Sequence, residues 1–269
     1  MKLKNKELKS YLNFAKEWAK GAGDILYQGF NQTKQINYKG RIDPVTQFDL
    51  KSERFITSRI KKTFPEYRLL AEEGDTVENN SPFCWVIDPL DGTVNYAHKI
   101  PIYTVSIALQ YNSQTIVGVV YDPERNELFS AVKGGGAFLN NKRIKVTSQK
   151  KLERSLLATG FAYNIGTARK NNLGMFARMM KQAQAVRRLG SAALDLCLVA
   201  AGRFDGFWEY YLHPWDTAAA ILIVEEAGGK VSKINGGSYS IFDREILASN
   251  GHIHLAMRKV LTRKIKRRK

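Results

Sequence analysis

Two neighbouring aspartates, Asp88 and Asp91, are the first candidates for chemistry in this chain. They follow the apolar run 83–87, and the segment continues Asp88-Pro-Leu-Asp91-Gly-Thr-Val-Asn95. The apolar run predicts a short buried strand, and the proline and glycine predict a turn at its end. Carboxylates this close repel by about 4 kcal/mol at ~4 Å in an effective dielectric near ~20. An aspartate-rich turn is the alternative, but a divalent cation would remove this repulsion, so the pattern favours a metal site.

Further acidic residues are expected at the ends of other elements. Glu72 follows a predicted strand over 67–71, Asp49 lies near the start of a predicted helix, and Asp216 precedes a strong helical segment. Each has a structural alternative, because acids are common in solvated loops, in the first turns of helices and at N-caps. Together with the aspartate pair, however, they supply the oxygen ligands that Mg²⁺ requires.

The elements that must position these acids follow from hydrophobic periodicity. Apolar residues at helical spacing predict a helix that ends near Gly29, and a second helix opens at Val45 to Asp49. Alternating β-branched segments between Ile102 and Ala131 predict an antiparallel meander. Strands are then expected at 156–159, 185–189 and 206–211, and helices at 171–181, 191–201 and 217–227. Gly134 to Gly136 lacks the Lys-Ser/Thr of a phosphate-binding loop and is interpreted as a turn.

Composition places the chain among globular proteins. It has 269 residues, of which 44% are hydrophobic and 11% aromatic. Cys84 and Cys197 lie in apolar runs and are too few for a disulfide scaffold, which favours a reducing compartment. There is no apolar secretory segment near the start and no apolar run of membrane-spanning length. These features predict a soluble cytoplasmic protein without a membrane segment.

The net charge of +17 is concentrated at the C-terminus, where residues 258–269 contain eight Lys or Arg and no acid. Such tails are usually solvated. Nucleic acid is therefore an open partner class, but no nucleic-acid-binding motif accompanies the tail. A general attraction to anionic ligands is the firmer inference.

The motifs resemble those of the inositol monophosphatase family, the lithium-sensitive, Mg²⁺-dependent phosphatases. The resemblance rests on the segment 88–95, on Glu72-Glu73, and on Trp215-Asp216-Thr-Ala-Ala with Glu-Ala-Gly-Gly downstream, and it extends to about Arg258. It implies an α/β protein with a layered αβαβα sandwich of the inositol monophosphatase and fructose-1,6-bisphosphatase type. It also implies a homodimer and a single phosphatase domain over residues 5–262, with two lobes sharing the site and a basic tail over 263–269.

Functional roles carried over from the family fall on matching positions. Glu72, Asp88 and the Leu90 carbonyl resemble the ligands of a first Mg²⁺. Asp88, Asp91 and Asp216 resemble those of a second, and Glu72 also serves a weaker third. Thr93 and Asp49 match the pair that orients and deprotonates the attacking water. Catalytic roles are thus implied for Thr93, Asp49 and Glu72.

The same resemblance implies substrate contacts from residues in several parts of the chain. The phosphate would be held by the backbone N–H groups of Gly92 and Thr93, where a helix start favours an anion. The other implied contacts are Asp91, Arg187, Gly190, Ser191, Ala192 and Glu209. For Glu209, a strand residue facing solvent is an equally good interpretation of the sequence. The segment between Lys39 and Asp49 is one residue shorter than in animal members of the family. Whether a third Mg²⁺ binds is therefore left open.

Inositol 1-phosphate or a similar small polyol phosphate is the leading substrate. Fructose 1,6-bisphosphate, histidinol phosphate, NADP and 3′-phosphoadenosine phosphate are alternatives, because the relatives that hydrolyse them share the metal motifs. A non-enzymatic alternative is a role as an RNA or ribonucleoprotein partner through the basic surface.

Overall fold

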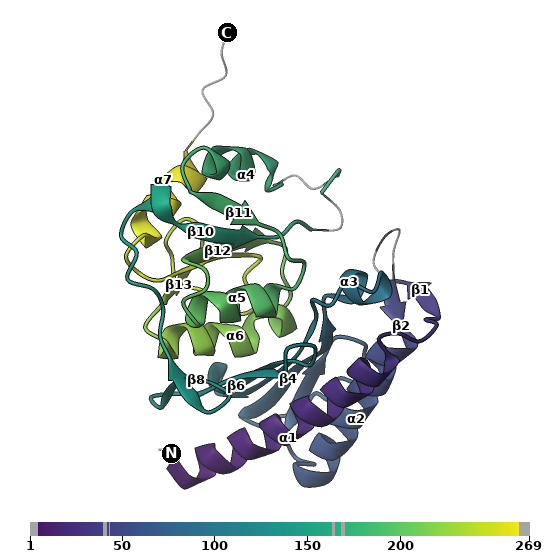
Figure 1. Cartoon of the computed structure of the whole chain (residues 1–269). Coiled ribbons are helices and arrows are strands. Elements are labelled where there is room, and N and C mark those ends of the chain that lie inside the picture. The colour runs from purple at the N-terminus through teal and green to yellow at the C-terminus, as the bar shows by residue number, and fades with distance from the viewer. Residues whose placement is uncertain (1–4, 40–41, 43, 163–164, 168–169, 264–269) are drawn as a thin grey trace.

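Helices and sheets alternate as layers in the computed structural model of the protein, which describes residues 5–39, 42, 44–162, 165–167 and 170–263. Helices α1 (Asn5–Gly29) and α2 (Gln47–Thr63) cover the outer face of a seven-stranded sheet (Figure 1). Helices α5 (Ala192–Ala200) and α6 (Pro214–Glu226) separate this sheet from a five-stranded one, whose outer face carries α4 (Leu173–Met180) and α7 (His254–Thr262). The αβαβα order expected from the family resemblance is therefore confirmed.

The seven-stranded sheet contains the predicted meander. Its strands lie in chain order, β3 pairs parallel with β4, and every later pair is antiparallel. The strands are β3 (Arg68–Ala71), β4 (Phe83–Asp91), β5 (Thr104–Tyr111), β6 (Gln114–Asp122), β7 (Glu127–Val132), β8 (Gly136–Leu139) and β9 (Lys142–Ile144). The last two were not predicted, although the turn at Gly134 to Gly136 was.

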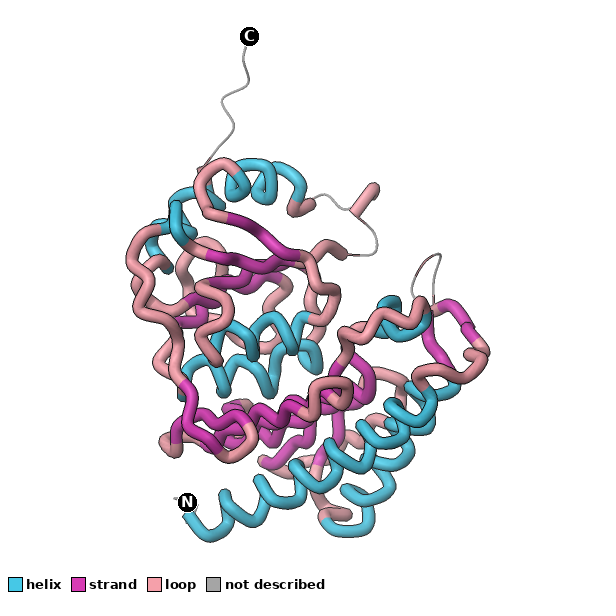
Figure 2. The backbone as a smooth tube through the Cα atoms, in the orientation of Figure 1, coloured by secondary structure: helices cyan, strands magenta, loops and turns pink. Residues whose placement is uncertain are grey.

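The five-stranded sheet has the order β11-β10-β12-β14-β13, with β10 parallel to both of its neighbours. Its strands are β10 (Leu156–Thr159), β11 (Ala185–Arg187), β12 (Gly206–Tyr210), β13 (Lys230–Ser232) and β14 (Glu245–Ser249). A short helix α3 (Thr93–Ala97) follows β4, and a hairpin of β1 (Ile36–Tyr38) and β2 (Pro44–Thr46) precedes α2 (Figure 2). A 3-10 turn, Leu152–Arg154, leads into β10.

The core has three parts that follow the layers. One lies between α1, α2 and the seven-stranded sheet, one surrounds α5 and α6 between the sheets, and one lies under α4 and α7. Ala218 to Val224 is almost wholly buried, because α6 has a sheet on each side. Cys84 and Cys197 are buried free thiols, as expected. Among the described residues, no helix is both long and apolar enough to cross a membrane.

Three local predictions were wrong. β4 does not stop before Asp88 but runs through Asp91, with a bulge between the two aspartates that accommodates the proline. The second helix does not open at Val45, because Val45 belongs to β2 and α2 begins at Gln47. The helix predicted from residue 217 begins at Pro214, so Asp216 is its third residue, and the N-cap alternative for Asp216 is wrong as well.

Candidate active site

A cavity of about 870 Å³ gathers residues from both sheets and from the β1–β2 hairpin. It brings together predicted site residues that are far apart in the chain. Those lining it are Glu72, Asp88, Leu90, Asp91, Gly92, Thr93, Gly190, Ser191, Ala192, Glu209 and Asp216. Two predicted residues, Asp49 and Arg187, are not among the lining residues.

The bulge in β4 fixes the positions of the two aspartates. Asp88 pairs in register with Ser106 of β5, and its Oδ1 accepts a hydrogen bond from the Leu90 N–H at 3.0 Å. Asp91 instead faces the start of α5. Its Oδ2 accepts from Ser191 Oγ at 2.6 Å and from the Ala193 N–H at 2.8 Å. The unpaired N–H groups of that helix start thus hold one of the carboxylates that the metal hypothesis requires.

The acids of the cavity disfavour one another's ionisation. Asp88 is only 1% exposed, and burial raises its pKa well above the usual range, with Glu72 and Asp91 raising it further. The pKa of Asp216 is also raised well above the usual range, first by burial and then by the charges of Asp91 and Glu72. A set of anionic oxygens that repel one another in a poorly solvated place has the donor chemistry of a Mg²⁺ site.

A lysine faces the acids from the hairpin side. Lys39 Nζ lies 3.1 Å from Glu72 Oε1 and 2.6 Å from Glu73 Oε1. Burial lowers the pKa of Lys39, but the two glutamates outweigh it and raise this pKa overall. Within the ranges that the structure describes, no three His, Cys, Asp or Glu side chains are arranged to hold one ion together. The types of donor atom therefore fit Mg²⁺. In this structure the carboxylates are spread around the cavity, and the Lys39 ammonium lies against Glu72.

The hydroxyl of Thr93 lies between the Asp49 carboxylate and the Leu90 carbonyl, both predicted site groups. Gly92 has φ 96°, and a Cβ there would lie 2.9 Å from the Ile102 carbonyl oxygen, so the sharp turn into α3 requires glycine. Thr93 Oγ1 is then 3.1 Å from Asp49 Oδ1 and 3.0 Å from the Leu90 carbonyl oxygen. The hydroxyl has one proton to donate, so the two acceptors share it or alternate.

Asp49 serves two purposes at once. It is the third residue of α2, and its Oδ2 accepts from the Thr46 N–H at 2.9 Å and from Thr46 Oγ1 at 2.5 Å, which completes a capping box. Its Oδ1 remains for Thr93. Burial raises the pKa of Asp49 to about 6, although the hydrogen bonds from Thr46 oppose the change. The interpretation of Asp49 as an acid in the first turn of a helix is thus correct. It does not conflict with the catalytic role that the family resemblance implies, because Oδ1 still contacts Thr93.

A further part of the cavity lining is built around Glu209. This residue is 8% exposed on β12 and lines the cavity, so the interpretation as a solvent-facing strand residue is wrong. Its carboxylate packs against Gly160, where a Cβ would be 2.2 Å from Oε1. Burial, with the charge of Asp91, raises the pKa of Glu209 to about 8, while Arg188 lowers it.

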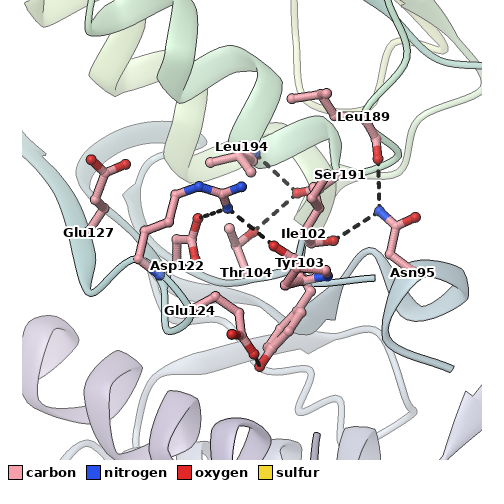
Figure 3. A network of polar contacts seen from close by, with 12 residues as sticks. Asn95, Ile102, Tyr103, Thr104, Asp122, Glu124, Glu127, Leu189, Ser191 and Leu194 are labelled. Carbon is pink, nitrogen blue, oxygen red and sulfur yellow. Dashed lines mark hydrogen bonds and ion pairs between the residues drawn. The ribbon is translucent and has the colours of Figure 1, made fainter. Parts of the chain in front are cut away.

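The small-residue segment at 190–192 is held by a hydrogen-bond network (Figure 3). Asn95 Nδ2 donates to the Leu189 carbonyl at 2.8 Å and to the Ile102 carbonyl at 2.9 Å. Ser191 Oγ lies 3.4 Å from Thr104 Oγ1 and caps α5 by accepting from the Leu194 N–H. The segment that would border the substrate is therefore tied to the strand and helix that carry Asp91 and Thr93.

Arg187, the predicted basic contact to the substrate, does not line the cavity. Arg187 is exposed at the end of β11, whereas the next residue, Arg188, lines the cavity and lies over the Phe161 ring. Arg244 also lines the cavity and was missed, because nothing in its local sequence marks it.

Asp195 was missed as well: it is buried beside the cavity, and its Oδ1 has no hydrogen-bond partner. Its position four residues after Ser191 on a helix was the available signal.

The sequence and the fold of this chain are similar to those of known proteins. Residues 7–267 match the model of the inositol monophosphatase family. The chain is 44% identical over 257 residues to an inositol-1-monophosphatase of Synechocystis sp., covering 95% of this chain and 90% of the relative. It is 40% identical to the Nus factor SuhB of Pseudomonas aeruginosa, over 89% of this chain and 91% of the relative. The crystal structure of the extragenic suppressor protein suhB from Bartonella henselae superposes with a TM-score of 0.91 at 38% identity, covering 95% and 100% of the chains.

Proposed function

Because the chain belongs to the inositol monophosphatase family and is a phosphatase, we propose that it hydrolyses inositol 1-phosphate, or a similar small polyol phosphate, with Mg²⁺. The observation that carries the proposal is the meeting of Asp88, Asp91 and Asp216 in one cavity with the Thr93–Asp49 pair. The resemblance further supports a homodimer, inhibition by lithium, a cytoplasmic location and one domain over 5–262 followed by a basic tail.

Different residues would bind the metal ions, bind the phosphate and activate the water. Glu72, Asp88, the Leu90 carbonyl, Asp91 and Asp216 would hold the ions, which, when bound, stabilise negative charge on the attacking and leaving oxygens. The N–H groups of Gly92 and Thr93 would hold the phosphate. The Thr93 hydroxyl, kept in place by Asp49, would orient the attacking water, and Asp49 would accept its proton through that hydroxyl.

Substrate choice would depend on the part of the cavity lined by Glu209 and by residues 190–192. The Glu209 side chain can accept hydrogen bonds from hydroxyl groups, which suits a polyol, and the small residues at 190–192 leave room for a ring. The test is a phosphate-release panel with purified protein over inositol 1-phosphate, fructose 1,6-bisphosphate, histidinol phosphate, NADP and 3′-phosphoadenosine phosphate. We expect inositol 1-phosphate to have the highest kcat/KM. A tenfold preference for any other member of the panel would contradict the substrate assignment.

A second function is proposed from the charge of the chain. The net charge of +17, together with relatives named Nus factor, favours an additional partner in a ribonucleoprotein. Deleting residues 263–269 should leave turnover of a small substrate unchanged and weaken salt-sensitive RNA binding. Lack of RNA binding by the full chain at physiological salt would remove this second function.

A further inference from the structure

One face of α2 reaches the loops that carry the acids of the cavity. Asp49, Ser52 and Glu53 are three and four residues apart, so their side chains project from the same side of the helix. Asp49 contacts Thr93, and Ser52 Oγ donates to the Pro89 carbonyl at 2.8 Å, in the bulge between Asp88 and Asp91. Glu53 reaches a different loop, the one that begins with Glu72.

Glu53 holds the backbone of that loop. Its side chain is nearly covered, since the residue is only 4% exposed. Oε2 accepts from the Glu73 N–H at 2.7 Å, and Oε1 accepts from the Asp75 N–H at 3.2 Å. Both oxygens are therefore bonded to the segment that immediately follows Glu72. The far end of this segment is secured separately, because Asp75 accepts from Thr57 Oγ1 at 2.5 Å.

The choice of an acid at this position has an electrostatic cost. Burial raises the pKa of Glu53, and the neighbouring charges of Glu73 and Asp75 raise it further, against the lowering effect of the two N–H groups. A neutral side chain would avoid this repulsion. A carboxylate, however, can accept from both N–H groups at once, and hydrogen bonds to a charged acceptor are about twice as strong as neutral ones.

We propose that Glu53 is a positioning residue for the metal site: by clamping the backbone of residues 73–75 to α2, it fixes Glu72 where that carboxylate can bind Mg²⁺. The inference rests on the proposed function, since it concerns Glu72 as a ligand. Residues that orient metal ligands typically change metal affinity or activity by about 10–100-fold when they are replaced.

The test compares Mg²⁺ binding by wild type and Glu53→Gln. Glutamine has nearly the same shape, but its amide NH₂ faces one of the two backbone donors and cannot accept from it. The Mg²⁺ midpoint in isothermal titration of the folded protein should increase about 10–100-fold, and the rise in Tm at a fixed Mg²⁺ concentration should be smaller than in wild type. At saturating Mg²⁺, kcat should return close to the wild-type value, because Glu53 does not touch the reacting atoms.

Asp205→Asn is the matched control. Asp205 is also a buried carboxylate that clamps backbone: it accepts from the Leu156 N–H at 2.8 Å and from the Thr147 hydroxyl, at the start of β12. Its replacement weakens one bond from a backbone N–H and one from a hydroxyl, far along the chain from the loop 72–75. It should lower the Tm in EDTA and leave the Mg²⁺ midpoint unchanged.

The outcomes separate the possible roles. A Glu53→Gln protein that loses stability as the control does, yet keeps the wild-type Mg²⁺ midpoint, would show that Glu53 is merely structural and overturn the proposal. If Glu53→Gln fails to fold, Glu53→Asp decides, because it keeps the charge but shortens the reach; an unchanged midpoint there would equally overturn it. Absence of any Mg²⁺ response in wild type would refute the proposed function itself, and the clamp with it.

Discussion

Asp88→Asn should abolish turnover and yet leave the protein, measured in EDTA, as stable as wild type or more stable. The reason is the crowding of acids around a side chain that is 1% exposed. Its carboxylate is opposed by burial and by Glu72 and Asp91, so the neutral amide removes repulsion. As the side chain proposed to bind both ions, it should also be the one whose loss most reduces the rise in Tm with Mg²⁺.

The same substitution has a predictable dependence on pH. The pKa of Asp88 is raised in the folded protein, so the folded state keeps a proton that the unfolded chain releases near its ordinary pKa of about 3.9. In EDTA, the contribution of Asp88 to the free energy of unfolding therefore falls as the pH rises above that value. The advantage of Asp88→Asn over wild type should accordingly increase with pH over this range.

Melting curves of both proteins, in EDTA and in saturating Mg²⁺, provide the measurement. If Asp88 were only a turn residue, its replacement would cost about 0.5–2 kcal/mol, as the loss of a capping side chain does, whether or not Mg²⁺ is present. A variant that melts clearly earlier in EDTA and keeps the full Mg²⁺ shift would rule out Asp88 as a ligand.

Thr93→Ala should lower kcat by about 10²–10⁴-fold, the usual contribution of a positioned proton-transfer group, while changing Mg²⁺ affinity far less. The Thr93 hydroxyl lies between Asp49 and the Leu90 carbonyl, so its removal breaks the path from Asp49 to the attacking water. It removes no carboxylate from the cavity. Steady-state kinetics across Mg²⁺ concentrations would separate the two quantities.

Thr93→Ser is the matched variant for this prediction. It keeps the hydroxyl and loses only a methyl group, so most of the activity should remain. Equal losses of kcat and Mg²⁺ affinity in Thr93→Ala would mean that the hydroxyl acts mainly on the metal ions and that its assigned role is wrong.

Much of this protein could be predicted from the sequence, because the relevant signals are local. Helical periodicity placed α1, and alternation placed β5, β6 and β7, since each pattern reflects which side of one element is buried. The short spacing of Asp88 and Asp91 indicated a shared site without any knowledge of the fold. The layered architecture, by contrast, came from the resemblance and not from periodicity.

Tertiary structure decided the course of β4. Proline and glycine after an apolar run are typical of a turn, yet β5 provides partners at Ser106 and Thr104 that keep the strand paired through Asp91. Because this pairing depends on a strand that comes later in the chain, the local residues do not reveal it. The strand continues, and the bulge absorbs the proline.

The surroundings of the acids were also decided by the fold. Asp91 is bonded to Ser191, a hundred residues away along the chain, and Lys39 lies against Glu72 although the two residues lie in different loops. Arg188 rather than Arg187 reaches the cavity, a difference of one position at the end of a strand. The sequence by itself determined which side chains could bind a metal and activate water. Their distances, burial and raised pKa values depend on contacts between distant segments, which exist only once the layers have packed.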